Sequence, residues 1–204
     1  CAWLKEKMKE GMVGKGLLGW MADYAEYCPP EQAPHGGDPV RAHCATPALW
    51  ARLNSELIDE CGLRGQALCF HRSAGPGANR YATAYWAGDQ TPTFDEHDGL
   101  ASSVTALITG GISGMSINHT DIGGFTTLVT SVYKLVRKKE VMLRWLEYAA
   151  FTPIFRTHDG AYANPDNYQF YYDDEGYAGF VKMARVHAAL GWYLALLEAE
   201  AVGR

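Results

Sequence analysis

Short apolar runs alternate with helical segments along this chain, and this alternation most strongly limits the folds it can form. The strand-like runs cover residues 16–22, 66–71, 82–88, 114–119 and 150–155. The segments with helical spacing of apolar residues cover 3–12, 46–62, 98–109, 134–148 and the chain from 174 onward. Strands that alternate with helices form parallel βαβ units, so we predict an α/β fold.

Polar side chains gather just after the strand-like runs. They are Asp23, Arg72, Asp89, His119 with Asp121, and Arg156 with His158. A (β/α)8 barrel and a doubly wound sheet both place their functional groups at the carboxyl ends of the strands, so this pattern alone does not choose between them. About five strand-like runs are fewer than a closed barrel needs. We therefore expect the chain to be one part of a larger fold.

Charge and hydropathy exclude two classes of partner. The net charge is −5, which gives no basic field for a nucleic acid or an anionic membrane. No apolar run approaches the roughly 18 residues that a membrane span needs. The chain begins with Cys1 rather than Met, as expected for a processed chain or a piece of a longer one.

The cysteines indicate reduced thiols. There are five, an odd number, and none stands in CxxC spacing: Cys1, Cys28, Cys44, Cys61 and Cys69. A disulfide framework or a zinc site is not expected from such a set, and the pattern leans weakly toward the cytoplasm.

Local signals predict several boundaries. Thr46 is the expected N-cap of a helix with Pro47 at its first position, and Gly62 is the expected stop. Asp95 and Asp98 are expected to be a turn residue and an N-cap.

Histidines and glycines give no further site. His119 and Asp121 lack additional ligands at a recognisable spacing, so a hydrogen-bonded turn is expected there rather than a metal site. The glycine-rich segments 75–79 and 108–114 do not have the pattern of a phosphate loop. No role is assigned to the isolated histidines His35, His43, His71 and His187.

Two of the strand ends share one form, an aromatic apolar run that closes on an aspartate. These are "GWMAD", ending at Asp23, and "YWAGD", ending at Asp89. Two carboxylates in unlike environments are what a glycosidase uses, one ionised and one holding a proton. Asp after a strand is also a common cap or turn residue, and Glu26 could form an ion pair within its loop. The residues alone therefore indicate a candidate two-carboxylate enzyme.

Four longer stretches resemble glycoside hydrolase family 31, in order and in spacing. They are "GWMADYAEY", "RSAGPGANRYATAYWAGDQ", "INHTDIGGFTTL" and "MLRWLEYAAFTPIFRTHDG". The closest likeness is to the α-sulfoquinovosidase branch. The resemblance implies a retaining α-glycosidase with a (β/α)8 TIM-barrel catalytic domain. Residues 1–204 would form about strands four to eight of it, without the preceding β-sandwich and early strands.

The resemblance also implies roles for the two aspartates. Asp23 matches the nucleophile and Asp89 the general acid/base of the family. Retention implies carboxyl groups about 5–5.5 Å apart. No metal and no organic cofactor is implied, and the partner is a small-molecule glycoside.

Further matched positions are expected to surround the sugar. Arg72 and His158 match residues that hold sugar hydroxyls. Trp86 and Asp121 match positions that line or support the pocket. Glu26 matches the supporting carboxylate of the nucleophile motif.

The substrate is the least constrained part of the resemblance. The sulfoquinovosidase branch has "GGYTTL", where the tyrosine helps to hold the sulfonate, whereas this chain has Phe125 in "GGFTTL". α-Sulfoquinovosides remain the first expectation. The alternatives are an α-glucosidase or α-xylosidase, and a non-catalytic carbohydrate-binding relative. We expect residues 1–204 alone to fold poorly and to be inactive, because an incomplete barrel exposes sheet edges.

Overall fold

The computed structural model describes residues 2–29, 31, 38–162 and 164–202. The chain divides into two compact units, Cys1–Tyr85 and Trp86–Arg204, and each is described by itself. In these described ranges, no helix combines the length and the apolar character needed to cross a membrane. The expectations for Cys1 and His35 lie outside the described residues.

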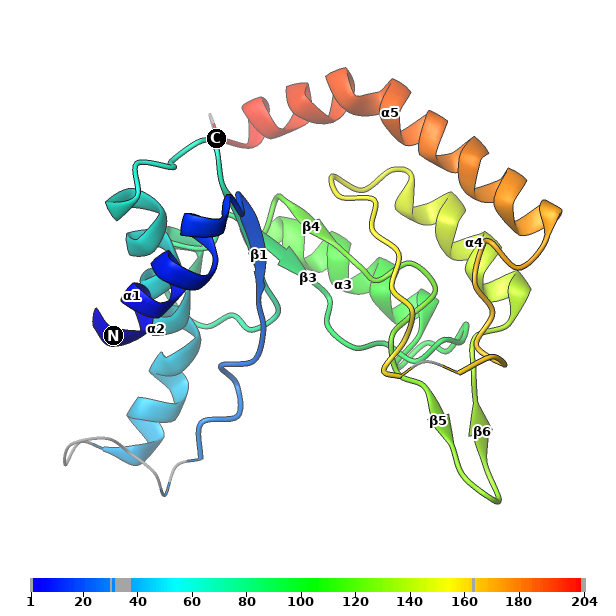
Figure 1. The fold of residues 1–204 in the computed structure, drawn as a ribbon, viewed down its shortest axis with the longest axis horizontal. Coiled ribbons are helices and arrows are strands. Elements are labelled where there is room, and N and C mark those ends of the chain that lie inside the picture. Colours follow the sequence, from blue (N-terminus) through cyan, green and yellow to red (C-terminus); the bar gives the residue numbers. More distant parts are fainter. Residues whose placement is uncertain (1, 30, 32–37, 163, 203–204) are drawn as a thin grey trace. The chain divides into compact units, whose positions relative to one another are not determined.

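The first unit places parallel strands beside two helices (Figure 1). Its elements are α1 (Ala2–Gly11), η1 (Val13–Lys15), β1 (Gly19–Ala22), α2 (Pro39–Glu60), β2 (Leu68–His71), η4 (Ala78–Arg80) and the first two residues of β3 (Ala84–Trp86). β1 pairs with β2 and β2 pairs with β3, both in parallel. The α/β prediction is confirmed in this unit, although the first strand is shorter than the run 16–22.

The start predicted for α2 is wrong. The helix begins at Pro39, and the side chain of Asp38 caps it by accepting the Val40 amide at 3.0 Å. Pro47 lies inside the helix, and the Thr46 hydroxyl donates to the Ala42 carbonyl at 2.8 Å. Pro at an early helical position and Pro in the middle of a helix look alike in sequence, so the N-cap signal at Thr46 was misleading.

The other end of α2 agrees with the sequence. The helix ends at Glu60, and Gly62 follows in a left-handed conformation with φ of 68°. Glycine adopts this conformation without steric cost, so Gly62 ends the helix as predicted.

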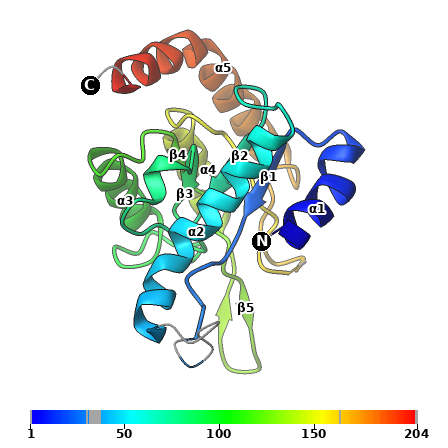
Figure 2. The ribbon, with the colours of Figure 1, turned by 90° about the vertical axis from the view of Figure 1, so that its left-hand side faces the viewer.

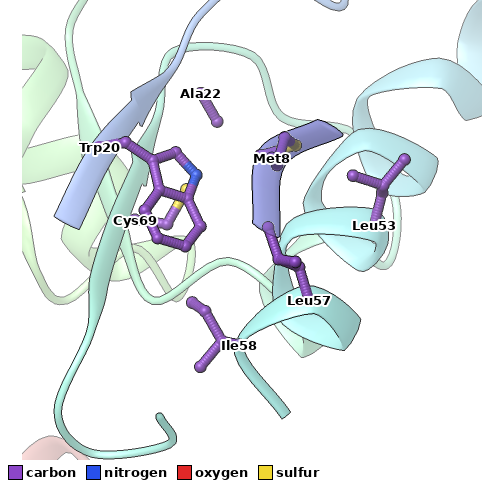
Figure 3. Close-up of a cluster of buried hydrophobic side chains, with 7 residues drawn as sticks. All are labelled: Met8, Trp20, Ala22, Leu53, Leu57, Ile58 and Cys69. Carbon is purple, nitrogen blue, oxygen red and sulfur yellow. The ribbon is translucent and has the colours of Figure 1, made fainter. Parts of the chain in front are cut away.

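The core of the first unit lies between α1, α2 and one face of the sheet. Figure 2 shows α2 running across β1 and β2, and Figure 3 shows the buried side chains between them. The cluster comprises Met8, Trp20, Ala22, Leu53, Leu57, Ile58 and Cys69. Trp20 donates its indole N–H to the Oδ1 of the buried Asn54 at 2.7 Å, so the polar edge of this large ring is satisfied. This packing fixes β1, and with it the residues that follow Ala22.

The second unit begins with the last residue of β3 and contains three helices. They are α3 (Leu100–Ile112), α4 (Lys139–Ala149) and α5 (Asp174–Val202). Its short strands are β4 (Asn118–His119), β5 (Leu128–Val129) and β6 (Lys134–Leu135). The amide of Ala87 donates to the His119 carbonyl at 2.9 Å, so the chain after β3 is bonded to β4.

The sequence misplaces the start of α3 by one position. Gly99 occupies the N-cap position, and its amide donates to the Ser102 hydroxyl at 2.9 Å. Asp98 is therefore not the N-cap. Asp95 is a turn residue as predicted, because its Oδ1 accepts the amides of His97 and Asp98.

Three other predicted boundaries need correction. The helix expected from Lys134 begins at Lys139, because residues 134–135 pair with 128–129 in an antiparallel hairpin (Figure 1). The run 114–119 forms a strand only at its last two residues. The run 150–155 forms turns, and only the later Thr157 makes a parallel bridge, to Ile122. Pro153 within this run cannot donate a ladder hydrogen bond, which disfavours a strand at that position.

The core of the second unit lies along α4. The cluster comprises Ile122, Val141, Met142, Trp145, Leu146 and Ala149. Trp145 is fully buried and donates its indole N–H to the Thr120 hydroxyl at 2.7 Å. α5 extends this packing through Phe180, whose ring stacks on Phe170 with centroids 4.0 Å apart. The segment 120–122 is thereby held against α4, next to the predicted pocket residue Asp121.

Candidate active site

Asp23 and Arg72 are neighbours because of the register between β1 and β2. Ala22 pairs with His71, so the next residue on each strand leaves the sheet at the same level. The Arg72 Nη1 lies 3.1 Å from the Asp23 Oδ1. The Arg72 side chain is 10% exposed and that of Asp23 is 34% exposed, so the carboxylate remains open to a ligand while its partner is largely enclosed.

Glu26 binds the same guanidinium from the other side. Its Oε1 accepts from Arg72 Nε at 2.8 Å and lies 2.6 Å from Nη2. The rings of Tyr24 and Tyr27 lie against the guanidinium, with centroids 4.6 and 5.6 Å from its central carbon. Glu26 therefore forms an ion pair, but with Arg72 after β2 and not within its own loop as expected.

The loop after Asp23 has an unusual backbone. Tyr24 and Ala25 have φ values of 63° and 83°, in the left-handed region that side chains other than glycine rarely adopt. Such residues persist only where the surroundings hold them, and they cluster at functional sites. Here Ser73 donates its hydroxyl to the Tyr24 carbonyl at 2.7 Å, and Trp50 donates its indole N–H to the Asp23 carbonyl at 3.1 Å.

A cleft of about 380 Å³ opens between this loop and α2. Its lining residues are Asp23, Tyr24, Ala25, Thr46, Leu49, Trp50 and Leu53. Four of these seven residues come from α2, and three of the four are apolar, so the cleft extends from the strained loop toward the helix.

In the second unit, Asp89 follows β3 and is exposed, while Trp86 is buried in the strand. The Asp89 carbonyl accepts the Thr126 hydroxyl at 2.8 Å, and the next carbonyl, of Gln90, accepts the Phe125 amide at 2.9 Å. The segment that carries Asp89 is therefore bonded to the segment that carries Phe125. This places two of the predicted site residues on adjoining loops.

Asp121 is buried and paired with Arg156. The carboxylate oxygen Oδ1 forms an ion pair with Arg156 Nη2, and Arg156 Nε donates to His119 Nε2 at 3.2 Å. Burial raises the pKa of Asp121, and the nearby charges of Arg156 and His158 oppose that rise. Arg156 thus contacts both Asp121 and His119, and the sequence indicated its importance only by its place after an apolar run.

His158 has one nitrogen committed to the protein. Its Nδ1 accepts the Gly160 amide at 3.1 Å, so in the neutral ring Nε2 carries the proton and can donate to a ligand. The ring meets Phe125 edge-on, with centroids 4.8 Å apart and planes at 88°. Phe125 and His158 therefore lie together, as expected for residues of one pocket.

Two supports of the first unit's loop were missed by sequence reasoning. Trp50 and Ser73 hold the strained backbone through side-chain donors, and neither stands in a motif that marks such a role. The described parts of the chain contain no group of three or more His, Cys, Asp or Glu side chains that could hold a metal ion.

Comparison with known proteins gives one consistent result. The family model of the glycosyl hydrolases family 31 TIM-barrel domain matches residues 1–193. The chain is 43% identical over 194 residues to the sulfoquinovosidase of Escherichia coli (strain K12), covering 95% of this chain and 28% of that protein. It is 38% identical over 201 residues to the sulfoquinovosidase of Agrobacterium fabrum, covering 98% of this chain and 30% of that protein.

A solved structure agrees with these relatives. The GH31 family sulfoquinovosidase from E. rectale, in complex with the aza-sugar inhibitor IFGSQ, superposes with a TM-score of 0.91 and 38% identity, over 98% of this chain and 30% of that one. The chain thus spans less than a third of the length of these relatives. The choice between a barrel and a doubly wound sheet is settled in favour of the barrel. The chain belongs to glycoside hydrolase family 31 and forms part of its TIM-barrel domain.

Proposed function

We propose that the complete protein containing this chain is a retaining α-glycosidase that hydrolyses terminal α-glycosides, with α-sulfoquinovosides as its substrates. The observation that carries the proposal is the placement of Asp23. It stands at the carboxyl end of a barrel strand, on a strained loop, with its Oδ1 3.1 Å from a largely enclosed arginine. The similarity to two sulfoquinovosidases over nearly the whole chain supports the choice of substrate.

The mechanism gives each aspartate a role in both of its steps. A carboxylate oxygen of Asp23 attacks the anomeric carbon while Asp89, protonated, gives its proton to the departing glycosidic oxygen. The bond from the anomeric carbon to the aglycone breaks, and an ester between Asp23 and the sugar forms. Asp89, now ionised, takes a proton from a water molecule that attacks the same carbon, and the ester bond from that carbon to Asp23 breaks, which releases the Asp23 carboxylate. The sugar leaves with its α configuration, and both carboxyl groups return to their starting states.

The surrounding residues hold the reacting groups. Arg72 binds Asp23 and Glu26 together, so the nucleophile cannot rotate freely. His158 offers its Nε2 proton to a sugar hydroxyl, since its Nδ1 is occupied by the Gly160 amide. Trp86 and Asp121 support the pocket from buried positions.

One observation favours a second candidate, an α-glucosidase or α-xylosidase. Phe125 stands where the sulfoquinovosidase branch has a tyrosine, and its ring meets His158 edge-on. A phenyl ring has no hydroxyl to donate to a sulfonate, and a hydrogen bond to a charged group contributes about 1.5–3 kcal/mol. Binding of a neutral sugar needs no hydrogen bond to a sulfonate, so phenylalanine at this position would not weaken it.

The test uses the complete gene product with 4-nitrophenyl α-sulfoquinovoside and 4-nitrophenyl α-glucoside side by side. We expect a preference for the sulfonated sugar, with release of the α anomer first in a proton NMR time course. A preference for the glucoside would assign the neutral-sugar function and leave the two-aspartate mechanism in place. Release of the β anomer would contradict retention. A well-folded protein that cleaves neither glycoside would support the non-catalytic, carbohydrate-binding alternative.

A further inference from the structure

Arg137 lies two residues before the start of α4 at Lys139, outside every motif that identified the family, and its side chain is buried. It is 1% exposed, although arginine is almost never fully buried without partners. Burial lowers the pKa of Arg137 to about 10, so the guanidinium still carries its charge at neutral pH. A buried charge that is retained needs a dense set of acceptors around it.

The acceptors come from three segments of the second unit. Nη1 donates to the carbonyls of Ile122 at 3.0 Å and Gly124 at 3.4 Å. Nη2 donates to the carbonyls of His158 at 2.8 Å and Asp159 at 3.2 Å. The remaining contacts run from Nε to the Tyr168 carbonyl at 2.9 Å and from Nη2 to the Gln169 Oε1 at 3.2 Å.

Two of these segments carry proposed pocket residues. Residues 122–124 lie between Asp121 and Phe125, and the second segment contains His158 itself. Each segment gives two carbonyls to one planar guanidinium. Because the donors of arginine are fixed in one plane, the positions of the two segments are set relative to each other.

The main chain of Arg137 is anchored as well. Its amide donates to Asn167 Oδ1 at 2.8 Å, and its carbonyl accepts the Tyr168 amide at 3.1 Å. The Asn167 Nδ2 in turn donates to the Asp159 carbonyl at 2.6 Å. The guanidinium therefore extends from a fixed backbone toward both loops.

The loop at residues 122–124 is shaped around this side chain. Gly123 has φ of 89°, and a Cβ there would lie 2.6 Å from Arg137 Nη1. Only glycine provides both the backbone conformation and the space. This is a second, independent sign that the contact between the loop and Arg137 is built into the fold.

We propose that Arg137 is a positioning residue for the sugar pocket, which fixes His158 relative to Asp121 and Phe125 by holding both loops on one guanidinium. The inference rests on the proposed glycosidase function for its catalytic consequence, but the tie between the loops is a property of the fold alone. It predicts that the two loops respond together when Arg137 is changed.

The first test measures the loops without reference to activity. In the complete gene product, Arg137→Lys replaces a planar group with five donors by a single ammonium group. Hydrogen–deuterium exchange of peptides covering 119–128 and 156–162 should accelerate in both loops. We expect an acceleration of about tenfold or more, which corresponds to a decrease of about 1.4 kcal/mol or more in the free energy of local opening. Arg144→Lys is the matched control, since Arg144 pairs on the helix surface with Glu140 and Glu147 and should leave both peptides unchanged.

A second variant covers the case in which Arg137→Lys does not fold. Gln169→Ala removes one acceptor of Arg137 and one donor to the Asp159 carbonyl. It should accelerate exchange at 156–162 more than at 119–128. Unchanged exchange in every soluble variant, or acceleration of one loop only in Arg137→Lys, would overturn the proposal.

The second test separates positioning from general stability. Arg137→Lys should lower kcat/KM about 10- to 100-fold in the otherwise natural protein, and less than about threefold in a His158→Ala background, because the group being positioned is gone. If Arg137→Lys lowers kcat/KM as much in the His158→Ala background as in the natural protein, so that the two losses multiply, the positioning role of Arg137 is contradicted. If the unaltered protein cleaves neither glycoside, the proposed function fails, and the exchange experiment still decides whether Arg137 ties the loops together.

Discussion

Arg72 and Asp23 leave neighbouring parallel strands at the same level, and Nη1 of the arginine lies 3.1 Å from Oδ1 of the aspartate. The contact follows from register: Ala22 pairs with His71, and each site residue is the next in its strand's direction. A shift of one residue in this pairing would separate the two groups and turn their side chains to opposite faces. The proposed nucleophile is thus placed by the hydrophobic packing of β1 and β2.

The first prediction concerns Asp23→Asn. The amide oxygen can still accept the Tyr24 N–H, which now bonds Oδ1 at 2.8 Å, so the fold should be retained. The neutral amide is a poor nucleophile and a poor leaving group, so kcat for the proposed glycoside should fall by about 10⁴-fold or more. The measurement is steady-state hydrolysis by the complete gene product.

Asp59→Asn is the matched control for this variant. Asp59 is an exposed carboxylate that pairs with Arg64, also in the first unit. Its replacement should change kcat less than about twofold, since exposed ion pairs contribute little. Residual activity of Asp23→Asn within tenfold of the unaltered protein would contradict the assignment of the nucleophile.

A second prediction concerns the choice between sulfonated and neutral sugars. Phe125→Tyr adds a hydroxyl where the sulfoquinovosidase branch has one. The ratio of kcat/KM for 4-nitrophenyl α-sulfoquinovoside over the glucoside should rise by about 10- to 150-fold, the equivalent of 1.5–3 kcal/mol for a hydrogen bond to a charged group. Phe94→Tyr, at a phenylalanine that is 49% exposed, should leave the ratio unchanged. An unchanged ratio in Phe125→Tyr would place sulfonate recognition elsewhere.

A third prediction concerns stability at acid pH. His71 is 1% exposed, and burial lowers its pKa from 6.5 to about 4. The folded state therefore binds fewer protons than the unfolded state between these values, and stability is lost as the pH falls from about 6.5 to about 4. The shift corresponds to about 3 kcal/mol at 1.36 kcal/mol for each pH unit.

The variant His71→Phe removes this titration while keeping an aromatic ring of similar size. Among the described residues, His71 Nδ1 has no hydrogen-bond partner, so the replacement should cost little at neutral pH. Urea denaturation of the complete gene product at about pH 7 and about pH 4 should show a smaller acid loss in His71→Phe than in the natural protein. His97→Gln, at a side chain that is 85% exposed, should behave like the natural protein. If the free energy of unfolding falls equally between about pH 7 and about pH 4 in the natural protein, His71→Phe and His97→Gln, then His71 is not the cause of the loss of stability.

The fourth prediction compares two glycines with similar backbone angles. Gly123 and Gly16 have φ values of 89° and 87°, but a Cβ at Gly123 would collide with Arg137, whereas no atom lies within 4 Å at Gly16. Gly16→Ala should cost about 1 kcal/mol for the backbone conformation alone. Gly123→Ala should cost about 3 kcal/mol or more, since the buried guanidinium must also move. If the temperature of thermal unfolding falls equally in both variants, the Arg137 side chain moves away from the added Cβ without a loss of stability.

Much of the fold could be predicted because it depends on local pattern. Apolar runs such as 66–71 correctly predicted parallel strands. The helical spacing of apolar residues from Asp174 onward correctly predicted α5. Several boundary predictions failed because the local signal allowed two conformations and the folded chain adopted the other one. Pro47 could begin a helix or lie within one, and the earlier cap at Asp38 decided.

The sequence indicated candidate site residues only after strand-like runs and within recognisable motifs. Asp23, Arg72 and His158 were singled out by their place after strand-like runs, and the family resemblance implied their roles. Register and loop bonds bring neighbours together around them. Arg137 could not be found this way. It opens the run Arg137–Lys138–Lys139, which resembles a solvated basic helix start, and only the folded chain shows that its first member is buried.

The main chain at Phe125 is held independently of its side chain. The backbone there is fixed by its own groups, since the Phe125 amide donates to Gln90 and its carbonyl accepts from Ala161, both at 2.9 Å. Neither bond depends on the side chain. A change of side chain at position 125 can therefore be accepted in a single mutational step, with no compensating change needed to hold this loop.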